Sequence, residues 1–308
     1  MRRLDEFRVF YNHTIHPELM RMERHRRRLW RLMFFSAFLI AGIIVMEFYL
    51  RIPLFSLMLL MGVFFYIAYL AYRIQHFRNT FKPNVINLLL DFIDDGPNYG
   101  TLRYDPKGFI PRKTFRASHI FASRAPEYRG EDLITGKIGE LEFQLCELNV
   151  REFSRVRNRL DYVFRGVFLT SKFNHEMAGA IVILPREFKQ YLTRSIKAIT
   201  RKGAYAVDPQ VLDDQFNQYF MTYATAQVNL HQMLSPDLQT AILEYRLRTD
   251  KKMYFSFLNQ QVYIAITEPK DLLEPYILRS NVSFELVREF FEDLEMVLRI
   301  VAELDRNN

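Results

Sequence analysis

The best prospect for acid–base chemistry in this sequence is His175, which Glu176 follows in the segment NHEM. A histidine takes up and releases a proton near neutral pH, and a neighbouring carboxylate can orient its ring. A histidine on a surface loop explains the same two residues, because strand-like runs flank the segment. His13 and His16 are three residues apart and would share a helix face, but the H-E-x-x-H arrangement of a helical zinc site is absent. We therefore predict no catalytic residue and no metal site.

Acidic residues are paired at four places, and the chain contains one cysteine. Neighbouring acids do not face one site on a helix, so the pairs are typical of surface charge. A single cysteine excludes a disulfide within the chain and a cysteine-based metal site. Cys146 lies in the strand-like run ELEFQLCEL, which favours a buried apolar side chain over a reactive thiol. The acidic pairs are Asp94–Asp95, Glu131–Asp132, Asp213–Asp214 and Glu292–Asp293.

Sequence motifs for cofactors and nucleophiles are missing. The glycines are scattered, no glycine cluster opens a helix after a strand, and no G-x-S-x-G segment occurs. The sequence predicts no cofactor and favours a protein that is not an enzyme. Distant residues that converge in the fold would leave no such motif, so an enzyme stays open.

Two apolar runs near the N-terminus predict a transmembrane helical hairpin. Residues 32–46 contain no charge, and residues 52–72 form a second uncharged run. About 20 helical residues cross the apolar core of a bilayer, so the second run suffices, and the first does if Glu47 sits at the interface. Pro53 suits the first turn of a new helix, and so short a connection makes the helices antiparallel. The alternative is a buried helix pair of a soluble protein.

Arginines at the ends of these runs predict the orientation. Positively charged flanks stay in the cytoplasm, and the turn between the runs contains only Arg51. Both termini should therefore be cytoplasmic. We predict a basic cytoplasmic segment at 1–28, a two-helix hairpin at 29–73 and a cytoplasmic domain at 82–308. The topology-determining arginines are Arg24, Arg26, Arg27, Arg28, Arg31, Arg73 and Arg78.

The remaining residues predict β-hairpins mixed with separate helices. Alternating apolar residues at 141–145 indicate a half-buried strand, and the polar residues 149–161 indicate an exposed connection. The runs 164–173 and 179–185 predict one hairpin, and residues 253–266 predict another. Because regular βαβ alternation is lacking, the predicted fold class is α+β.

Several helices are predicted in this domain: a short one at 84–94, one that starts at Asp208–Pro209, one that starts at Ser235–Pro236 and a long amphipathic one at 283–305. The last has a heptad seam, which suits packing on the sheet or a coiled coil. A further helix at 185–203 has a basic face that is either solvated or in contact with a membrane surface. The residues for that contact are Lys189, Arg194, Lys197, Arg201 and Lys202.

Charge is distributed unevenly along the chain. The net charge of +7 divides into +5 over residues 1–100, +9 over 101–202 and −7 over 203–308. The domain thus has a basic half, 82–203, and an acidic half, 204–308. A basic surface is attracted to anionic lipids, and charge alone is no reason to expect specific nucleic-acid binding. The expected partners are the lipid bilayer and a protein partner or a second copy of the chain.

Several stretches carry a family resemblance: YRGEDLITGKIGELEFQLCEL, VFRGVFLTSKFNHEMAGAIVILP, QFNQYFMTYAT, LSPDLQTAIL, FSFLNQQVYIAI and KDLLEP. Their order over residues 80–305, after two hydrophobic helices, resembles an uncharacterised bacterial two-helix membrane-protein family, domain of unknown function 3137. The resemblance implies a bacterial inner-membrane protein with a cytoplasmic α+β domain. It implies no catalytic residue.

The leading functional hypothesis is a membrane-anchored cytoplasmic binding or scaffold module. Its basis is the predicted anchor, the uneven charge and the lack of a reactive motif. One alternative is an enzyme or sensor that acts on a lipid or a membrane-associated ligand, which a deep pocket with converging polar groups would favour. Another is a subunit of an oligomeric transporter or channel, since two helices cannot enclose a pathway alone.

Overall fold

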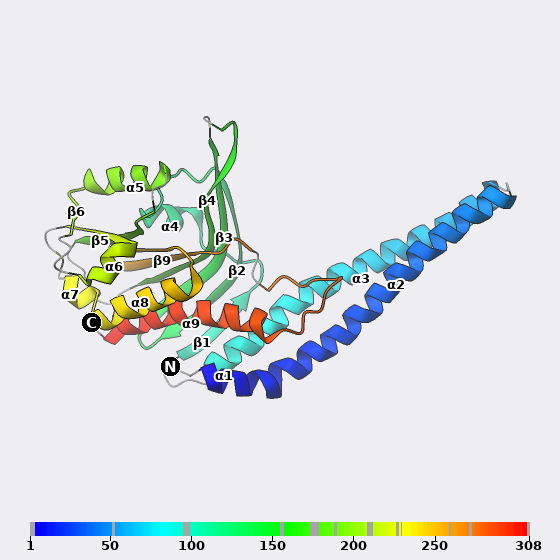
Figure 1. Cartoon of the computed structure of the whole chain (residues 1–308), viewed down its shortest axis with the longest axis horizontal. Helices are drawn as coiled ribbons and strands as arrows, with labels where there is room; N and C mark the ends of the chain where they lie inside the picture. The colour runs from blue at the N-terminus through cyan, green and yellow to red at the C-terminus, as the bar shows by residue number, and fades with distance from the viewer. Residues whose placement is uncertain are drawn as a thin grey trace. The chain divides into compact units, whose positions relative to one another are not determined.

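The computed structural model groups the chain into two compact units, which are described separately (Figure 1). The helical unit comprises residues 2–92 and 273–290, and the sheet unit comprises residues 93–272 and 291–308. The predicted division at 28, 73 and 82 stays a prediction. The structure describes residues 4–50, 53–94, 99–154, 157–172, 179–187, 190–207, 212–225, 228, 230–258, 260–270 and 273–306.

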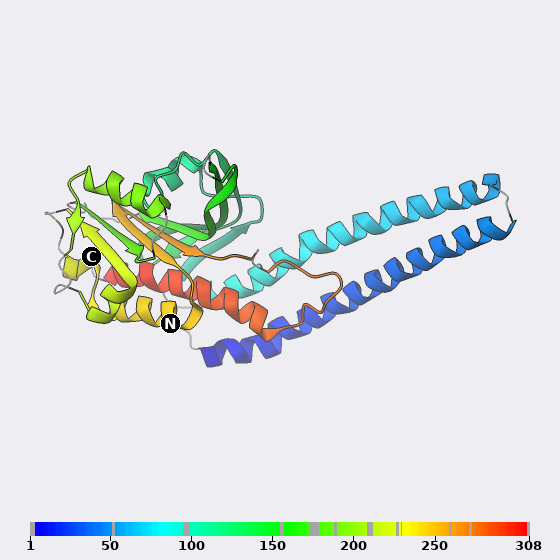
Figure 2. The same ribbon diagram turned by 45° about the horizontal axis from the view of Figure 1, so that its top comes forward.

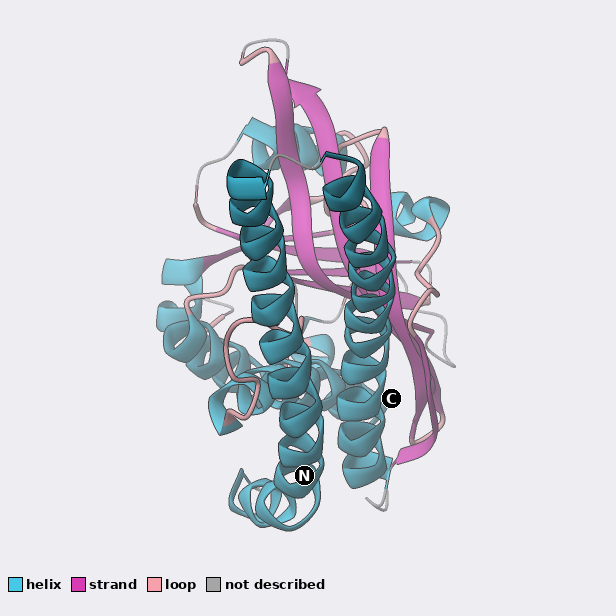
Figure 3. Cartoon of the chain, turned by 90° about the vertical axis from the view of Figure 1, so that its right-hand side faces the viewer, coloured by secondary structure: helices cyan, strands magenta, loops and turns pink. Residues whose placement is uncertain are grey.

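The helical unit contains two long antiparallel helices (Figures 2 and 3). Helix α1 (Leu4–Phe10) and a π-helical turn (Tyr11–Ile15) lead into α2 (His16–Leu50), and α3 follows (Pro53–Asp94). Both long helices contain windows apolar and long enough to cross a membrane. Phe48 and Leu54 are each 80% exposed. A contiguous apolar surface of this kind is poorly solvated by water.

Helix α3 runs unbroken through Pro83, so the prediction of a separate helix at 84–94 is wrong. A proline inside a helix removes one backbone hydrogen bond and costs about 3 kcal/mol. Burial of the following turns offsets this cost, because Val85, Ile86 and Leu89 are each at most 1% exposed. The Phe92 ring packs at a tilt against the Phe7 ring of α1, with ring centroids 5.5 Å apart.

The sheet unit contains one antiparallel sheet of nine strands among the described residues, in the order β1-β2-β3-β4-β9-β8-β5-β7-β6. With the helices, it confirms the α+β prediction. The strands are β1 (Tyr99–Asp105), β2 (Glu127–Ile138), β3 (Leu141–Ser154), β4 (Arg159–Lys172), β5 (Ala180–Pro185), β6 (Tyr205–Ala206), β7 (Phe220–Ala224), β8 (Met253–Leu258) and β9 (Gln261–Thr267).

Two strand predictions are wrong. Most of the polar residues expected to form an exposed connection belong to strands: residues 149–154 belong to β3 and 159–161 to β4, and the two strands pair as far as Ser154 and Arg159. Their side chains are polar because this end of the hairpin is largely exposed. Strands β4 and β5 form no hairpin, since β4 pairs with β3 and β9 while β5 pairs with β7 and β8. The predicted β8–β9 hairpin is confirmed.

Helices cover both faces of the sheet (Figures 1 and 2). On one face, Cys146, Phe164 and Phe168 form a core with Phe115 and Phe121. On the other face lie α8 and the part of α9 from residue 291 onward. The heptad residues of this part of α9 are buried, as packing on the sheet requires; they are Phe291, Leu294, Leu298 and Val301. The helices are α4 (Arg112–Ala117), α5 (Gln190–Thr200), α6 (Asp214–Tyr219), α7 (Leu230–Met233), α8 (Pro236–Thr249) and α9 (Phe284–Arg306).

The starts of two helices test the predicted caps. Ser235 caps α8 as predicted, because its hydroxyl accepts a hydrogen bond from the Leu238 amide. The predicted cap at Asp208 lies outside the described residues. Asp213 caps the neighbouring helix α6 and accepts hydrogen bonds from the amides of Gln215 and Phe216.

Candidate functional site

One row of polar side chains crosses six strands of the sheet at the same level. Each member is directly opposite the next in the strand register. Residues that are paired in this way point to the same face. From β1 to β8 the row consists of Arg103, Thr135, Gln144, Thr170, Tyr263 and Ser256.

The first four members of this row line a recess with a volume of about 500 Å³. Thr114 of α4 also lines it, as do Lys137, Glu142 and Lys172. The ammonium of Lys137 lies 3.2 Å from the Glu142 carboxylate. Arg103 and Lys172 form no ion pair within the described part of the chain. The recess therefore contains three cations and one carboxylate, which is a positive balance.

Two local features of the recess are costly for the fold. Thr170 is 8% exposed, and its hydroxyl is buried with no hydrogen-bond partner among the described residues. A buried polar group without a partner costs about 1–3 kcal/mol, and a polar ligand or water at this point would reduce that cost. Thr101 has a φ of +54° at the irregularity in the β1–β2 register. Left-handed backbone at a β-branched residue is strained, and such strain is frequent at ligand sites.

These features suit the binding of a small anion. Arginine and lysine supply charge-assisted hydrogen bonds to carboxylate or phosphate oxygens, and threonine and glutamine supply neutral donors. No histidine, cysteine or aspartate lines the recess within the described residues. The lining therefore favours binding over catalysis. Sequence reasoning missed these residues because four separate strands contribute them.

The predicted membrane-surface residues gather on and just after α5. Lys189 lies outside the described residues. Arg194 and Lys197 are exposed, with Arg194 3.9 Å from Glu152. Lys202 Nζ lies 2.7 Å from His119 Nε2, and burial together with Lys202 lowers the pKa of His119. Arg201 is also exposed, so these four side chains share an exposed basic region, whose contact with lipid stays a prediction.

The arginines predicted to set the topology have different surroundings. Arg26 is 7% exposed and binds the Glu23 carboxylate through Nε and Nη2, at 2.7 Å in each case. Its Nη1 donates to the Ile277 carbonyl at 2.5 Å. The hydrogen bonds from Arg26 hold the pKa of Glu23 below its usual value. Arg26 thus also fixes the segment before α9. The other predicted arginines are exposed or half-buried; these are Arg24, Arg27, Arg28, Arg31, Arg73 and Arg78.

The residues considered first for chemistry do not form a catalytic group. His175 and Glu176 lie outside the described residues. His13 and His16 lie on the helical segment that begins the helical unit. Cys146 is fully buried, as predicted, and burial raises the pKa of its thiol to about 12. At neutral pH it is a protonated core residue.

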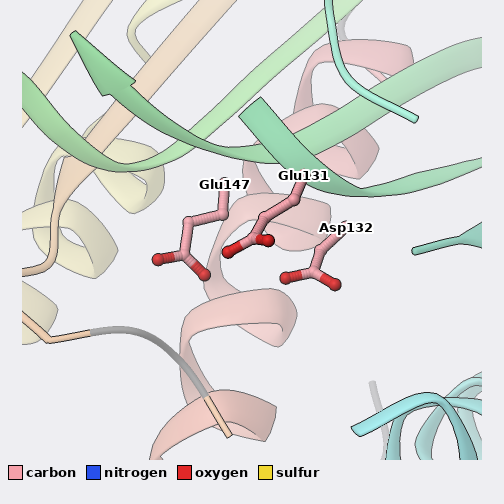
Figure 4. Close-up of side chains that lie close together, drawn as sticks. All are labelled: Glu131, Asp132 and Glu147. Carbon is pink, nitrogen blue, oxygen red and sulfur yellow. The ribbon is translucent and has the colours of Figure 1, made fainter. Parts of the chain in front are cut away.

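One acidic pair does converge with a third carboxylate (Figure 4). Glu131 and Asp132 of β2 and Glu147 of β3 offer oxygen atoms within 4.8 Å of one another. Asp132 has a φ of +60° where the β2–β3 register shifts, so adjacent acids turn to one side. Oxygen donors of this kind suit magnesium or calcium. Each of the three also interacts with other groups of the protein, so the cluster does not assign a metal site.

Residues 162–306 match the model of a family described as "Protein of unknown function (DUF3137)". The expected resemblance is confirmed over these residues, which run from within β4 to the end of α9. Among solved structures, the chain is similar to the crystal structure of the mycobacterial trehalose monomycolate transport factor A, TtfA, with a TM-score of 0.32 and 9% identity. That similarity covers 63% of this chain and 88% of the other. No curated protein matches the chain.

Proposed function

We propose that this chain, with the DUF3137 match at its residues 162–306, is a membrane-anchored binding module. Helices α2 and α3 hold it in a bilayer, and the sheet unit binds a small anionic ligand in its polar recess. The observation that carries this proposal is the row of polar side chains across β1, β2, β3 and β4, with Arg103 at its end and the buried Thr170 hydroxyl in its floor.

The anchoring part is supported by the outward-facing apolar side chains of α2 and α3. Phe38 is 76% exposed, and Leu57 is 65% exposed. Leaving such side chains in water loses about 1.5–3 kcal/mol for each one, whereas lipid acyl chains accept them. The arginines before α2's apolar run and after α3's run support an inner-membrane location with both termini in the cytoplasm.

The binding part is supported by the balance of groups in the recess. A phosphate or carboxylate would meet Arg103 and Lys172, which lack ion-pair partners among the described residues. A recess of about 500 Å³ accommodates a small metabolite rather than a protein segment. The acidic half of the domain, 204–308, with a net charge of −7, is the part proposed to meet a protein partner or a second copy.

The test is thermal unfolding of the full-length protein in zwitterionic detergent, with sodium phosphate, sulfate or citrate replacing chloride at constant ionic strength. A ligand that binds only the folded state raises the unfolding temperature, and 100-fold excess over Kd stabilises by about 2.7 kcal/mol. We expect at least one of these anions to stabilise the wild type. Arg103→Gln and Lys172→Gln should each remove most of that stabilisation.

Lys107→Gln is the matched control, because Lys107 is an exposed cation that does not line the recess. It should retain the wild-type response to the anion. Equal responses of all four proteins would contradict an anion site in the recess. Failure of the wild type to respond to any of the three anions would contradict it as well.

A further inference from the structure

A second recess lies within the helical unit, between the parts of α2 and α3 next to their apolar runs. Its volume is about 590 Å³. Arg21 and His25 of α2 line one wall, and Tyr72, Arg73 and His76 of α3 line the other. It is called the inter-helix groove here. None of these residues belongs to the polar recess of the sheet.

The position of the inter-helix groove along the helices places it at the membrane surface. Tyr72 is the last residue of the uncharged run of α3, and His25 precedes the uncharged run of α2 by seven residues. At 1.5 Å per residue, seven residues span about 10 Å, which is comparable with the depth of the headgroup layer. Once α2 and α3 are in a bilayer, lipid headgroups would therefore surround the end of the groove that His25, Tyr72 and Arg73 line.

The charge of the groove favours an anion. Arg21 is paired with Glu18 at 3.6 Å. Arg73 has no ion-pair partner among the described residues, and its guanidinium lies 3.2 Å from the Tyr69 hydroxyl and over the Tyr69 ring. His25 is affected by this positive charge, because burial and then Arg73, Arg28 and His76 lower its pKa. A negative group in the groove would be attracted to Arg73.

We propose that the inter-helix groove binds the phosphate of an anionic phospholipid, with Arg73 as the main ligand and His25 and His76 beside it. Basic pockets between helices at the cytoplasmic surface suit such headgroups. The Tyr72 ring lies at the level where the glycerol and the first carbons of the acyl chains would be. This inference depends on the membrane anchoring proposed above and is independent of the recess in the sheet.

Trp30, the only tryptophan, allows a direct test. It lies on α2 five residues after His25, which is about 7–8 Å along the axis, and is 37% exposed. The full-length protein is reconstituted in phosphatidylcholine nanodiscs. One series contains increasing fractions of phosphatidylglycerol with brominated acyl chains, and the other contains brominated phosphatidylcholine. We expect the fluorescence of Trp30 to be half-maximally quenched at a several-fold lower fraction of brominated phosphatidylglycerol than of brominated phosphatidylcholine.

Variants separate the groove from general surface charge. Arg73→Gln should weaken the preference for phosphatidylglycerol over phosphatidylcholine about fivefold, which is the change expected from one cation near the headgroups. Thr80→Phe should weaken it by filling the groove without changing a charge, since Thr80 lines the groove and is exposed. Arg24→Gln is the control, because Arg24 is an exposed arginine of α2 outside the groove. It should retain the preference.

The outcomes distinguish the possible errors. Equal quenching by the two brominated lipids, or equal losses in Arg73→Gln and Arg24→Gln, would overturn the lipid site. Loss of the preference on addition of millimolar inorganic phosphate would assign the groove to a soluble phosphate and overturn the lipid as its occupant. Failure of the wild type to enter nanodiscs at all would instead refute the membrane anchor.

Discussion

The ammonium group of Lys251 lies 2.6 Å from Oδ2 and 2.9 Å from Oδ1 of Asp293, and 2.7 Å from the Glu268 carboxylate. Lys251 precedes β8, Glu268 follows β9 and Asp293 belongs to α9, so this cluster joins three elements of the sheet unit. The Tyr245 hydroxyl of α8 also donates to Asp293. Burial acts to lower the pKa of Lys251, but the two carboxylates outweigh it and raise that pKa above its usual value.

Lys251→Met should destabilise the sheet unit by about 3–5 kcal/mol, because two buried carboxylates lose their cation. Lys252→Met is the matched control: Lys252 pairs with Glu187, which is partly exposed, and such a pair contributes less than about 1 kcal/mol. Urea unfolding of the full-length protein in detergent, followed by circular dichroism, measures both. Similar losses in the two variants would refute a structural role for the buried cluster.

The Cys146 thiol should resist alkylation in the folded protein. Its pKa of about 12, against an ordinary value of 9.0, makes the thiolate about a thousandfold rarer near neutral pH, and its side chain is inaccessible. Iodoacetamide at pH 8 should modify it rapidly in urea and at least a thousandfold more slowly without urea, as measured by intact-mass spectrometry. Rapid modification of the folded protein would show that the core around Cys146 opens readily.

The same residue predicts a dependence of stability on alkaline pH. Because the raised pKa belongs to the folded state, the unfolded chain loses its thiol proton from about pH 9 while the folded protein keeps it until about pH 12. The free energy of unfolding should therefore fall as the pH rises from 9 towards 12, by about 1.4 kcal/mol per unit from this group. The free energy of unfolding of Cys146→Ala, measured with urea, should fall less steeply between pH 8 and 10.5 than that of the wild type. An identical slope would contradict the assignment.

Gly166→Ala should unfold or strongly destabilise the sheet unit. Gly166 has a φ of +143°, and an added Cβ would lie 2.1 Å from the Ile266 carbonyl oxygen on the neighbouring strand β9. This contact cannot be relieved without moving backbone, so we expect a loss of at least about 3 kcal/mol. Gly100→Ala is the control on β1, since nothing lies within 4 Å of its added Cβ. Thermal unfolding should shift only for Gly166→Ala.

The sequence by itself determined the features that depend on neighbouring residues. The apolar runs of α2 and α3 are read directly from composition, because about 20 successive apolar residues suffice to match a bilayer. The start of α8 at Ser235–Pro236 and the β8–β9 hairpin were also predicted, since a helix cap is set by local hydrogen bonds and a hairpin joins strands that are adjacent in sequence.

Only the tertiary structure decided which strands are neighbours and which side chains meet. The residues between β4 and β5 suggested a hairpin, yet β9 pairs with β4 and β8 pairs with β5, so the β8–β9 hairpin, which is distant in sequence, lies between them in the sheet. The polar recess depends on the register that aligns Arg103 with Thr135. A shift of one residue would turn every side chain of a strand to the opposite face, and no local pattern sets that register. The convergence of Glu131 and Asp132 likewise depends on a β-bulge, which the spacing of the two acids does not reveal.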